Sequence, residues 1–348
     1  MNAPVRITTV SVSTANLRDL AESARLDAFV HDHPDGTPFH RPQWSRAVAA
    51  GTGSRAHYLV AEQRGALVGL LPLTEVRSAL FGSSLVSVGF GVGGGVLALS
   101  GEAGACLTDA AVELATERRC PTIELRGGPL PPFWRASEGV YAGFARDLPG
   151  DGDAILKSIP RKQRAEVRKA LDEGLDSAIG RDLARHFAVY AASVRNLGTP
   201  VFPRRLFRAM LDEFGDDADI LVISKDGKPL SAVLSLYMNG TVYPYWGGGT
   251  AEARGARANE LLYFELMKHA ATRGCTRFDF GRSKVGTGAF SFKKNWGFEP
   301  RSLVYASWGK ARETNPLDPK FRLKIEAWKR LPLWAANRVG PVISKGLG

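Results

Sequence analysis

Two stretches of the chain repeat one pattern: HYLVAEQRGALVGLLPL at His57–Leu73 and DILVISKDGKPLSAVLS at Asp219–Ser235. They align without a gap at an offset of 162 residues. Each begins with a β-rich run, passes through Arg64-Gly65 or Asp226-Gly227, and resumes as an apolar run. This pattern predicts a two-stranded hairpin with its turn in the middle. The repeat therefore indicates that one structural unit occurs twice.

The same order of elements follows each hairpin: a Gly-rich strand end, a helical pattern and a further strand. The segments are Ser87–Leu99, Ala105–Arg118 and Thr122–Arg126 in the first copy, and Thr241–Thr250, Asn259–Arg273 and Arg277–Gly281 in the second. A strand–helix–strand crossover makes its two strands parallel neighbours. The sequence thus predicts an α/β (α+β) fold with two mixed sheets, and the arrangement resembles two tandem GNAT (acyl-CoA N-acyltransferase-like) domains.

The length of 348 residues fits two domains. We predict an N-terminal domain at residues 1–150, a C-terminal domain at 151–309 with a basic helix at the junction, and a basic, Trp-containing tail at 310–348. The junction sequence PGDGD is a plausible joint, and Pro160 fits the first turn of the basic helix. Two more helices, Asp182–Asn196 and Pro203–Phe214, open the second half.

Composition predicts a globular cytoplasmic protein. Apolar residues make up 44% and charged residues 23%. The first residues lack an apolar signal segment, and the uncharged stretch Ser78–Gly101 is too rich in Gly and Ser for a membrane helix. The three cysteines, without CxxC spacing, favour neither a disulfide framework nor a zinc site. The six histidines form no metal pattern, so we expect no metal and no bound cofactor.

The net charge of +11 comes from two segments, the basic helix and the tail. The helix carries Lys157, Arg161, Lys162, Arg164, Arg168 and Lys169 against Glu166. The tail carries nine Lys or Arg and three acidic residues. Such segments attract phosphates, nucleic acid or an anionic membrane face, although a solvated helix face is the simple alternative.

Four stretches resemble the FemAB-like family, and most closely its exosortase/PEP-CTERM-associated subgroup. They are TPFHRPQW at 37–44, IPRKQRAEVRKALDEGL at 159–175, YPYWGGGTAEARGARANELLYFELM at 243–267 and FDFGRSKVGTGAFSFKKNWGFEP at 278–300. The resemblance implies a tandem GNAT-fold transferase. Family members move an aminoacyl group from charged tRNA onto an amine of a peptidoglycan precursor. The subgroup occurs with exopolysaccharide genes, which implies a sugar intermediate as another acceptor.

The segment Phe280–Phe298 holds the predicted catalytic residues. The strand FDFG leads to Arg282, Ser283 and Lys284, which we expect on a loop at its carboxyl end, where α/β sheets bind ligands. A short helix, Phe290–Asn295, follows. Its Phe292-Lys293 pair resembles the FK element that places a lysine at the Fem reaction centre. Such a cation stabilises the oxyanion formed when an amine attacks an ester. A surface lysine is the alternative.

Further candidates lie on the strands. Strand alternation predicts Asp279 on the face opposite the flanking phenylalanines, where it orients Arg282, accepts a proton or forms a structural ion pair. Tyr243 and Tyr245 share one predicted face and Trp246 the other; the stripe is either core or a ligand platform beside the glycines at 247–249. Asn259 is a helix cap or a substrate contact.

The spacing of Arg161, Arg164 and Arg168 places them on one helix face, with Lys162 beside them, as a phosphate site. The donor is an aminoacyl-tRNA or an acyl-CoA. CoA-dependent GNAT proteins carry Gln or Arg three residues before a glycine at the strand–helix turn. Here Glu252 precedes Gly255 in that position, and LSGEAGACL in the first half lacks the motif too. This departure favours a donor other than acyl-CoA.

Three functions remain open at this point. The first is a FemAB-like transferase acting on a phosphate-bearing small-molecule or lipid-linked acceptor, with tRNA as a further partner. The second is a CoA- or carrier-protein-dependent N-acyltransferase. The third is a non-catalytic module that binds RNA or a membrane surface. Residues 320–348 mix tryptophans with Lys and Arg, so they either pack on the protein or contact the inner membrane peripherally.

Overall fold

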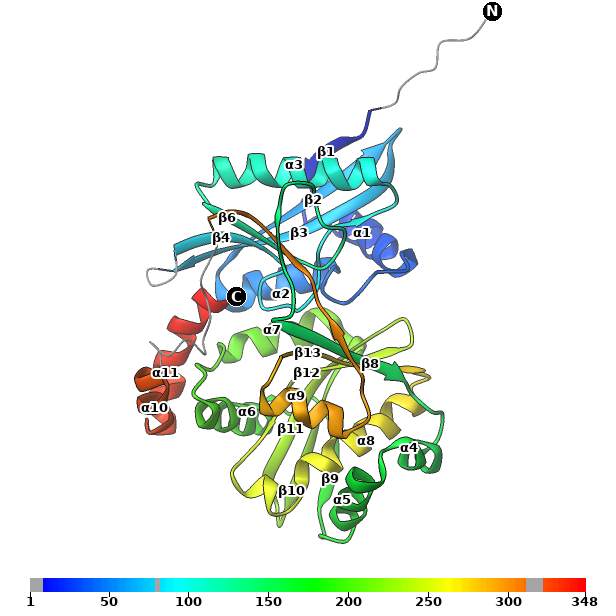
Figure 1. The fold of residues 1–348 in the computed structure, drawn as a ribbon, viewed down its shortest axis with the longest axis vertical. Coiled ribbons are helices and arrows are strands. Elements are labelled where there is room, and N and C mark those ends of the chain that lie inside the picture. The colour runs from blue at the N-terminus through cyan, green and yellow to red at the C-terminus, as the bar shows by residue number, and fades with distance from the viewer. Residues whose placement is uncertain (1–8, 79–81, 311–321) are drawn as a thin grey trace, which may run out of the picture. The chain divides into compact units, whose positions relative to one another are not determined.

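The structure is a computed structural model that describes residues 9–78, 82–310 and 322–348. It contains two compact units (Figure 1), each with its own mixed β-sheet. The first unit consists of residues 1–137, 304–313 and 346–348, and the second of residues 138–303 and 314–345. Residues 1–8, which bear on the expected lack of a signal segment, and residues 311–321 of the predicted tail lie outside the described residues.

The units exchange two strands relative to the boundaries predicted at residues 150 and 309. Strand β8 (Tyr141–Asp147) pairs with β13 (Arg277–Lys284) in the second unit. Strand β15 (Tyr305–Gly309) pairs with β6 (Thr122–Arg126) in the first. Alternation along a strand shows which residues face a core, but not which sheet supplies the hydrogen-bonding partner. The local sequence pattern therefore cannot show that β8 belongs to the second sheet and β15 to the first.

The sheet of the first unit has the order β1-β2-β3-β4-β6-β15-β7, with β5 paired to β3. The remaining strands are β1 (Ser11–Thr14), β2 (Arg55–Gln63), β3 (Ala66–Ser78), β4 (Gly82–Ser87), β5 (Leu97–Ala98) and β7 (Arg135–Ser137). The predicted hairpin is β2–β3, and Arg64 and Gly65 both have positive φ, as a tight hairpin turn requires. β4 and β6 are parallel, as predicted. Most of the Gly-rich stretch 87–99 is a loop rather than a strand.

Helices cover both faces of this sheet. The helices are α1 (Leu20–Asp32), α2 (Pro42–Thr52) and α3 (Gly101–Glu117). α3 buries Leu107 and Ala111 against Leu59 and Leu71 of the hairpin. The alternate residue Tyr58 faces α2 and donates from its hydroxyl to the carbonyl oxygen of His40.

The sheet of the second unit has the order β14-β8-β13-β12-β11-β10-β9. Its other strands are β9 (Asp176–Gly180), β10 (Ala218–Lys225), β11 (Lys228–Met238), β12 (Thr241–Gly249) and β14 (Pro300–Ser302). β10–β11 is the second predicted hairpin, with positive φ at Asp226 and Gly227. β12 and β13 are parallel where they pair. Both copies of the repeat therefore contain the predicted crossover.

The second unit holds the remaining helices. They are α4 (Gly152–Ser158), α5 (Arg161–Leu171), α6 (Leu183–Leu197), α7 (Arg204–Phe214), α8 (Ala258–Thr272), α9 (Gly288–Asn295), α10 (Arg322–Lys329) and α11 (Leu333–Ser344). α8 lies on the sheet with α4 and α5 against it, and α6 packs on β11 and β12. No helix in the described part of the chain is long and apolar enough to cross a membrane.

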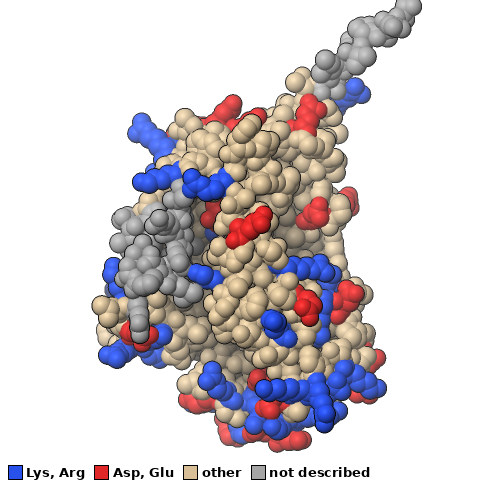
Figure 2. All heavy atoms as spheres, viewed as in Figure 1, with Lys and Arg blue, Asp and Glu red and all other residues tan. Residues whose placement is uncertain are grey.

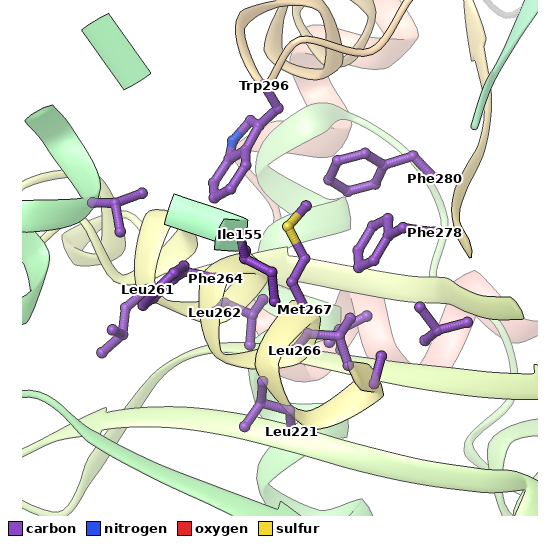
Figure 3. Packing of buried hydrophobic residues seen from close by; sticks show 14 of the residues in the cluster. Ile155, Leu221, Leu261, Leu262, Phe264, Leu266, Met267, Phe278, Phe280 and Trp296 are labelled. Atoms are coloured by element: carbon purple, nitrogen blue, oxygen red, sulfur yellow. The ribbon is translucent and has the colours of Figure 1, made fainter. Parts of the chain in front are cut away.

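The core of the second unit gathers around α8 and β13. Figure 3 shows Phe278 and Phe280 of β13 beside Met267 of α8, with Trp296 above them. These side chains are almost fully buried, and burial of apolar area is the main stabilising term in folding. Phe278 and Phe280 thus face the core, which is the condition under which strand alternation turns Asp279 to the opposite face. Their burial fixes the position of Asp279 between them.

A buried polar cluster ties the end of α8 to the hairpin β10–β11. Asp219, 7% exposed, accepts hydrogen bonds from the Tyr237 hydroxyl at 2.9 and 3.0 Å. His269 Nε2 lies 2.8 Å from the same carboxylate, and the Arg273 guanidinium lies 3.9 Å from it. A buried carboxylate is tolerable because these partners compensate its lost hydration.

Candidate functional site

The parallel strands β12 and β13 of the second unit separate soon after they begin. They pair only at Thr241 with Arg277 and at Val242 with Phe278. From there β12 continues beside β11, whereas β13 continues beside β8. The carboxyl-terminal parts of two neighbouring strands are therefore not hydrogen-bonded to each other. In α/β sheets such a divergence at the carboxyl ends is where ligands bind.

A β-bulge in β13 lies at this divergence. The pairing with β8 shifts between Asp279, opposite Ala145, and Arg282, opposite Gly143. Gly281 has φ +65° within the bulge, a conformation that favours glycine. Asp279 stabilises the bulge because its Oδ1 accepts a hydrogen bond of 2.7 Å from the Gly281 amide.

The predicted catalytic lysine binds the carbonyl groups of this bulge. Lys293 Nζ donates to the carbonyl oxygens of Phe280 at 2.7 Å and Arg282 at 2.9 Å, and lies 3.4 Å from that of Gly281. An ammonium group has three N–H donors, and two of them make these short hydrogen bonds. The nitrogen also lies 5.4 Å from the ring centroid of Phe144. Lys293 is therefore not a surface lysine, and its cation is held beside the strand divergence.

Burial sets the protonation of the pair Lys293 and Asp279. Loss of hydration lowers the pKa of Lys293 to about 7, although Asp279 opposes the change. Burial likewise raises the pKa of Asp279, and the Gly281 amide and Lys293 oppose that shift. The carbonyl acceptors favour the ammonium form of Lys293. Two neighbouring groups whose pKa values are shifted in opposite directions by burial are typical of proton-transfer sites.

The residues after FDFG do not form the predicted loop. Arg282, Ser283 and Lys284 continue β13 and pair with Gly143, Ala142 and Tyr141 of β8. The prediction of a loop was wrong because β8 extends the sheet past the bulge. Ser283 is buried, and the Arg282 guanidinium stacks 4.5 Å from the ring centroid of Tyr141. Phe292 packs on Tyr263 of α8 at 5.5 Å between ring centroids.

β8 contributes residues that the sequence did not suggest. Phe144 faces Lys293, and Tyr141 lies under Arg282. The alternation in VYAGFARD was a usable strand signal. This segment precedes the PGDGD joint, however, and therefore falls within the predicted N-terminal domain.

The aromatic stripe on β12 belongs to the core at Trp246. A bulge at Tyr245 puts Trp246 opposite Leu234, two positions from the Leu236 partner of Tyr243. Trp246 and Tyr243 therefore share a face, and the prediction that they face opposite ways was wrong. Trp246 is 4% exposed and lies 5.2 Å from the Phe207 ring. Tyr245 remains half-buried beside it.

Packing alone explains the glycines that follow. A Cβ on Gly248 would lie 2.3 Å from Ser193 Oγ. A Cβ on Gly249 would lie 2.7 Å from Oδ1 of Asn259, in the first turn of α8. Asn259 therefore packs against the end of β12.

The cationic side chains of the basic helix α5 are of two kinds, one hydrogen-bonded within the protein and the others exposed. Arg164 donates to the carbonyl oxygens of Lys157 and Ile159 at 2.9 Å each, which caps the end of α4. Arg161, Lys162 and Arg168 are exposed. Figure 2 shows Lys and Arg side chains over this part of the surface with Asp and Glu among them. The structure thus leaves three of the four predicted phosphate-binding side chains available to a ligand.

Acidic residues surround the N-terminus of α8, where a GNAT protein would bind the CoA pyrophosphate. Arg257 has φ +53° just before the helix and pairs with Glu166 of α5 at 2.8 Å and with Glu173, which follows α5, at 3.0 Å. Glu260 lies in the first helical turn, and burial raises the pKa of its carboxyl. The ion pairs occupy the Arg257 guanidinium, so it is not available to bind a pyrophosphate. The geometry supports the sequence argument that the CoA motif is degraded.

A separate cavity of about 410 Å³ lies within the first unit, beside β5 and the carboxyl end of β6. Its polar side chains are already engaged: Arg126 donates to the carbonyl oxygens of Val88 and Gly91, and His40 Nδ1 accepts from the Thr37 amide. Burial lowers the pKa of His40 to about 4, so this histidine is neutral. These groups stabilise the walls of the cavity.

No group of three or more His, Cys, Asp or Glu side chains in the described ranges is placed to hold a metal ion.

Comparison with known proteins complements this geometry. Residues 161–294 match the model of the acetyltransferase (GNAT) domain family. No curated protein matches the chain by sequence.

Three solved structures resemble the whole chain. FemX has 16% identity and a TM-score of 0.65 over 90% of this chain and 99% of its own. A tandem GNAT protein from the clavulanic acid biosynthesis pathway has 14% identity and a TM-score of 0.55, over 86% and 98%. The chain has the tandem GNAT fold. The predicted fold class is thereby confirmed.

A third similar structure comes from Agrobacterium fabrum. It is the C-terminal domain of a protein described as a lysylphosphatidylglycerol synthetase, with 13% identity and a TM-score of 0.54 over 83% of this chain and 92% of that domain. Identities this low establish the shared fold alone. Together with the matching acetyltransferase domain, these findings support a transferase.

Proposed function

We propose that this chain is a FemAB-like acyl- or aminoacyltransferase whose reaction takes place beside the bulge of β13. The observation that carries the proposal is the buried ammonium group of Lys293, bound to carbonyl oxygens where β12 and β13 separate. A fixed, desolvated cation at the carboxyl ends of two parallel strands can stabilise negative charge that develops on a substrate.

The reaction joins an acceptor amine to the carbonyl carbon of an activated ester or thioester. The nitrogen forms a bond to that carbon, the carbonyl oxygen becomes negatively charged, and the carbon–oxygen or carbon–sulfur bond of the donor then breaks. The amine loses one proton, and the departing alcohol or thiol gains one. Lys293 stabilises the oxyanion, Arg282 adds positive charge, and Asp279 accepts the proton of the amine.

We propose aminoacyl-tRNA as the donor in preference to acyl-CoA. The reason is that Glu166 and Glu173 occupy the Arg257 guanidinium just before α8, so this cation is already paired where a pyrophosphate would bind. The charged tRNA would add its own phosphates, which the excess of Lys and Arg in this chain attracts.

The acceptor in this proposal is a phosphate-bearing intermediate of the cell envelope or of an exopolysaccharide, used in the cytoplasm. The exposed side chains of Arg161, Lys162 and Arg168 provide its phosphate contacts. We further propose Tyr245, Asn259, Ser283, Lys284 and Phe292 as acceptor-binding residues. The likeness of four sequence stretches to the exosortase/PEP-CTERM-associated subgroup supports a saccharide acceptor.

The test compares Lys293→Met with Lys294→Met. Both variants lose one ammonium group from α9, but Lys294 is exposed and its nitrogen lies 6.0 Å from the ring centroid of Phe290 instead of at the bulge carbonyls. Purified protein is incubated in parallel with charged tRNA, acetyl-CoA or acyl carrier protein and a panel of amine-bearing sugar phosphates, and products are read by mass.

We expect transfer from charged tRNA by the wild type and by Lys294→Met, and a loss of at least about a hundredfold for Lys293→Met. Binding of tRNA, measured separately, should persist in both variants. Equal transfer by Lys293→Met and the wild type contradicts the proposed site. Transfer from acetyl-CoA alone identifies a CoA-dependent enzyme, and RNA binding without any transfer identifies a binding module.

A further inference from the structure

The helices α10 and α11 are held on the second unit by a defined inner face. Ile325 of α10 packs so closely on Gly198 that a Cβ there would lie 2.5 Å from it. Arg195 of α6 donates to the carbonyl oxygen of Lys329 at 3.1 Å, which fixes the turn that follows α10. On α11, Ala336, Gly340 and Ser344 are buried at a spacing of four residues. The outer face of the pair therefore has a fixed orientation.

That outer face exposes large apolar side chains. Leu323 is 84% exposed, Trp334 73% and Val342 73%. Leu197 of α6, 71% exposed, precedes the glycine that packs on Ile325 of α10. Several large apolar side chains exposed on one docked helix pair indicate an interaction surface, whereas single ones are usual on a protein surface.

Positive charge accompanies these apolar side chains. Residues 323–348 contain five Lys or Arg and one Glu, a net charge of +4. Glu326 pairs with Lys329 at 2.8 Å. Arg338 is exposed between Trp334 and Val342 on one line of α11, since the three positions are four residues apart. Cations thus lie next to the apolar groups.

We infer that the outer face of α10 and α11, with Leu197, binds the surface of a bilayer containing anionic phospholipid. Tryptophan and aliphatic side chains insert at the boundary between headgroups and acyl chains, while Lys and Arg bind lipid phosphates. RNA would satisfy the cations but leave the Leu and Val side chains in water. The inference is independent of the proposed reaction, because it concerns a different face and needs no turnover.

The expected binding is weak and reversible, because only a few apolar side chains and cations take part. Each cation near an anionic surface contributes about a fivefold gain in affinity. Each inserted apolar side chain contributes roughly tenfold.

The experiment measures binding of the full chain to phosphatidylcholine vesicles with and without phosphatidylglycerol, by co-sedimentation. Leu323→Ser is compared with Leu20→Ser, because Leu20 in the first unit has nearly the same exposure, 82%. Arg338→Glu is compared with Arg55→Glu, an exposed arginine of β2. Quenching of tryptophan fluorescence by brominated lipid is recorded for the wild type and Trp334→Phe.

The inference predicts binding that requires phosphatidylglycerol, falls about tenfold in Leu323→Ser and more than fivefold in Arg338→Glu, and is unchanged in the two control variants. Quenching should fall in Trp334→Phe although that variant still binds. Absence of binding to anionic vesicles overturns the inference. An equal loss of vesicle binding in Leu20→Ser and Leu323→Ser also overturns it. RNA binding that anionic vesicles do not reduce would overturn it as well.

Discussion

Lys293 Nζ lies 2.7 Å from the carbonyl oxygen of Phe280, so a lysine on α9 is hydrogen-bonded to the bulge of β13. The contact joins two residues thirteen positions apart and brings a cation to the place where β12 and β13 separate. It also makes the position of the cation dependent on the conformation of the strand, because the bulge supplies its acceptors.

The buried Lys293 should make stability depend on pH above neutrality. Its pKa of about 7 in the folded chain lies below the value of 10.5 for a free lysine, so the unfolded chain binds more protons between these values. The free energy of unfolding should therefore rise with pH across this window, by at most about 1.4 kcal/mol per pH unit. Urea denaturation of the wild type and Lys293→Met between pH 7 and 10 measures the difference. If the difference in unfolding free energy between the wild type and Lys293→Met stays constant across the window, the Lys293 amine is not desolvated. Lys294→Met serves as the control.

Asp219→Asn should destabilise the second unit strongly. The substitution removes the charge that faces His269 and Arg273 and disturbs the hydrogen bonds from Tyr237. Breaking a buried ionic cluster on one side costs about 3–5 kcal/mol. Tyr237→Phe, which removes one hydroxyl, should cost about 1–2 kcal/mol. Urea denaturation tests both, with the exposed Asp176→Asn as a control expected within about 0.5 kcal/mol of the wild type. Equal stability of Asp219→Asn and the control would contradict the assigned cluster.

Gly248→Ala should lower the free energy of unfolding by about 1–3 kcal/mol, because its Cβ would lie 2.3 Å from Ser193 Oγ. The combination with Ser193→Gly should recover much of the loss. Gly255→Ala is the control, since its Cβ would meet only the Glu252 carbonyl oxygen at 3.6 Å. Denaturation midpoints of the wild type, the double variant and both single glycine variants measure these changes in stability. Failure of Ser193→Gly to restore stability would mean that the glycine serves something other than packing.

Arg164→Met and Arg168→Met should have different effects although both remove one charge from α5. Arg164 caps the carbonyl groups at the end of α4, so its loss should cost about 1–2 kcal/mol of stability. Arg168 is exposed, so its loss should leave stability unchanged and weaken the binding of pyrophosphate, measured by calorimetry. Pyrophosphate affinity that is unaffected by Arg168→Met would exclude this helix as the phosphate site.

The hairpins and crossovers could be predicted from the sequence because their signals are local. Alternation, the turns at Arg64-Gly65 and Asp226-Gly227, and the helical periodicity of α3 and α8 all lie within short windows. Burial of Phe278 and Phe280 followed from the same alternation. These features determine the fold class.

The geometry of the candidate site was not accessible in this way. The bulge at Tyr245 moved Trp246 to the face of Tyr243, and the pairing of β8 kept Arg282 in a strand. Both effects depend on strands that are distant in sequence. The sequence identified Lys293 as a candidate, but its carbonyl partners arise only when the bulge forms. Its catalytic role stays a prediction.

The assignment of β15 to the first unit has a consequence for synthesis on the ribosome. Among the described strands, β7 pairs with β15 alone, and β15 is made more than 160 residues later. When residue 137 leaves the exit tunnel, the growing chain cannot yet complete its first sheet. A truncated product that ends before residue 305 leaves the edges of β6 and β7 without their partner, so we expect it to aggregate or to be captured by chaperones.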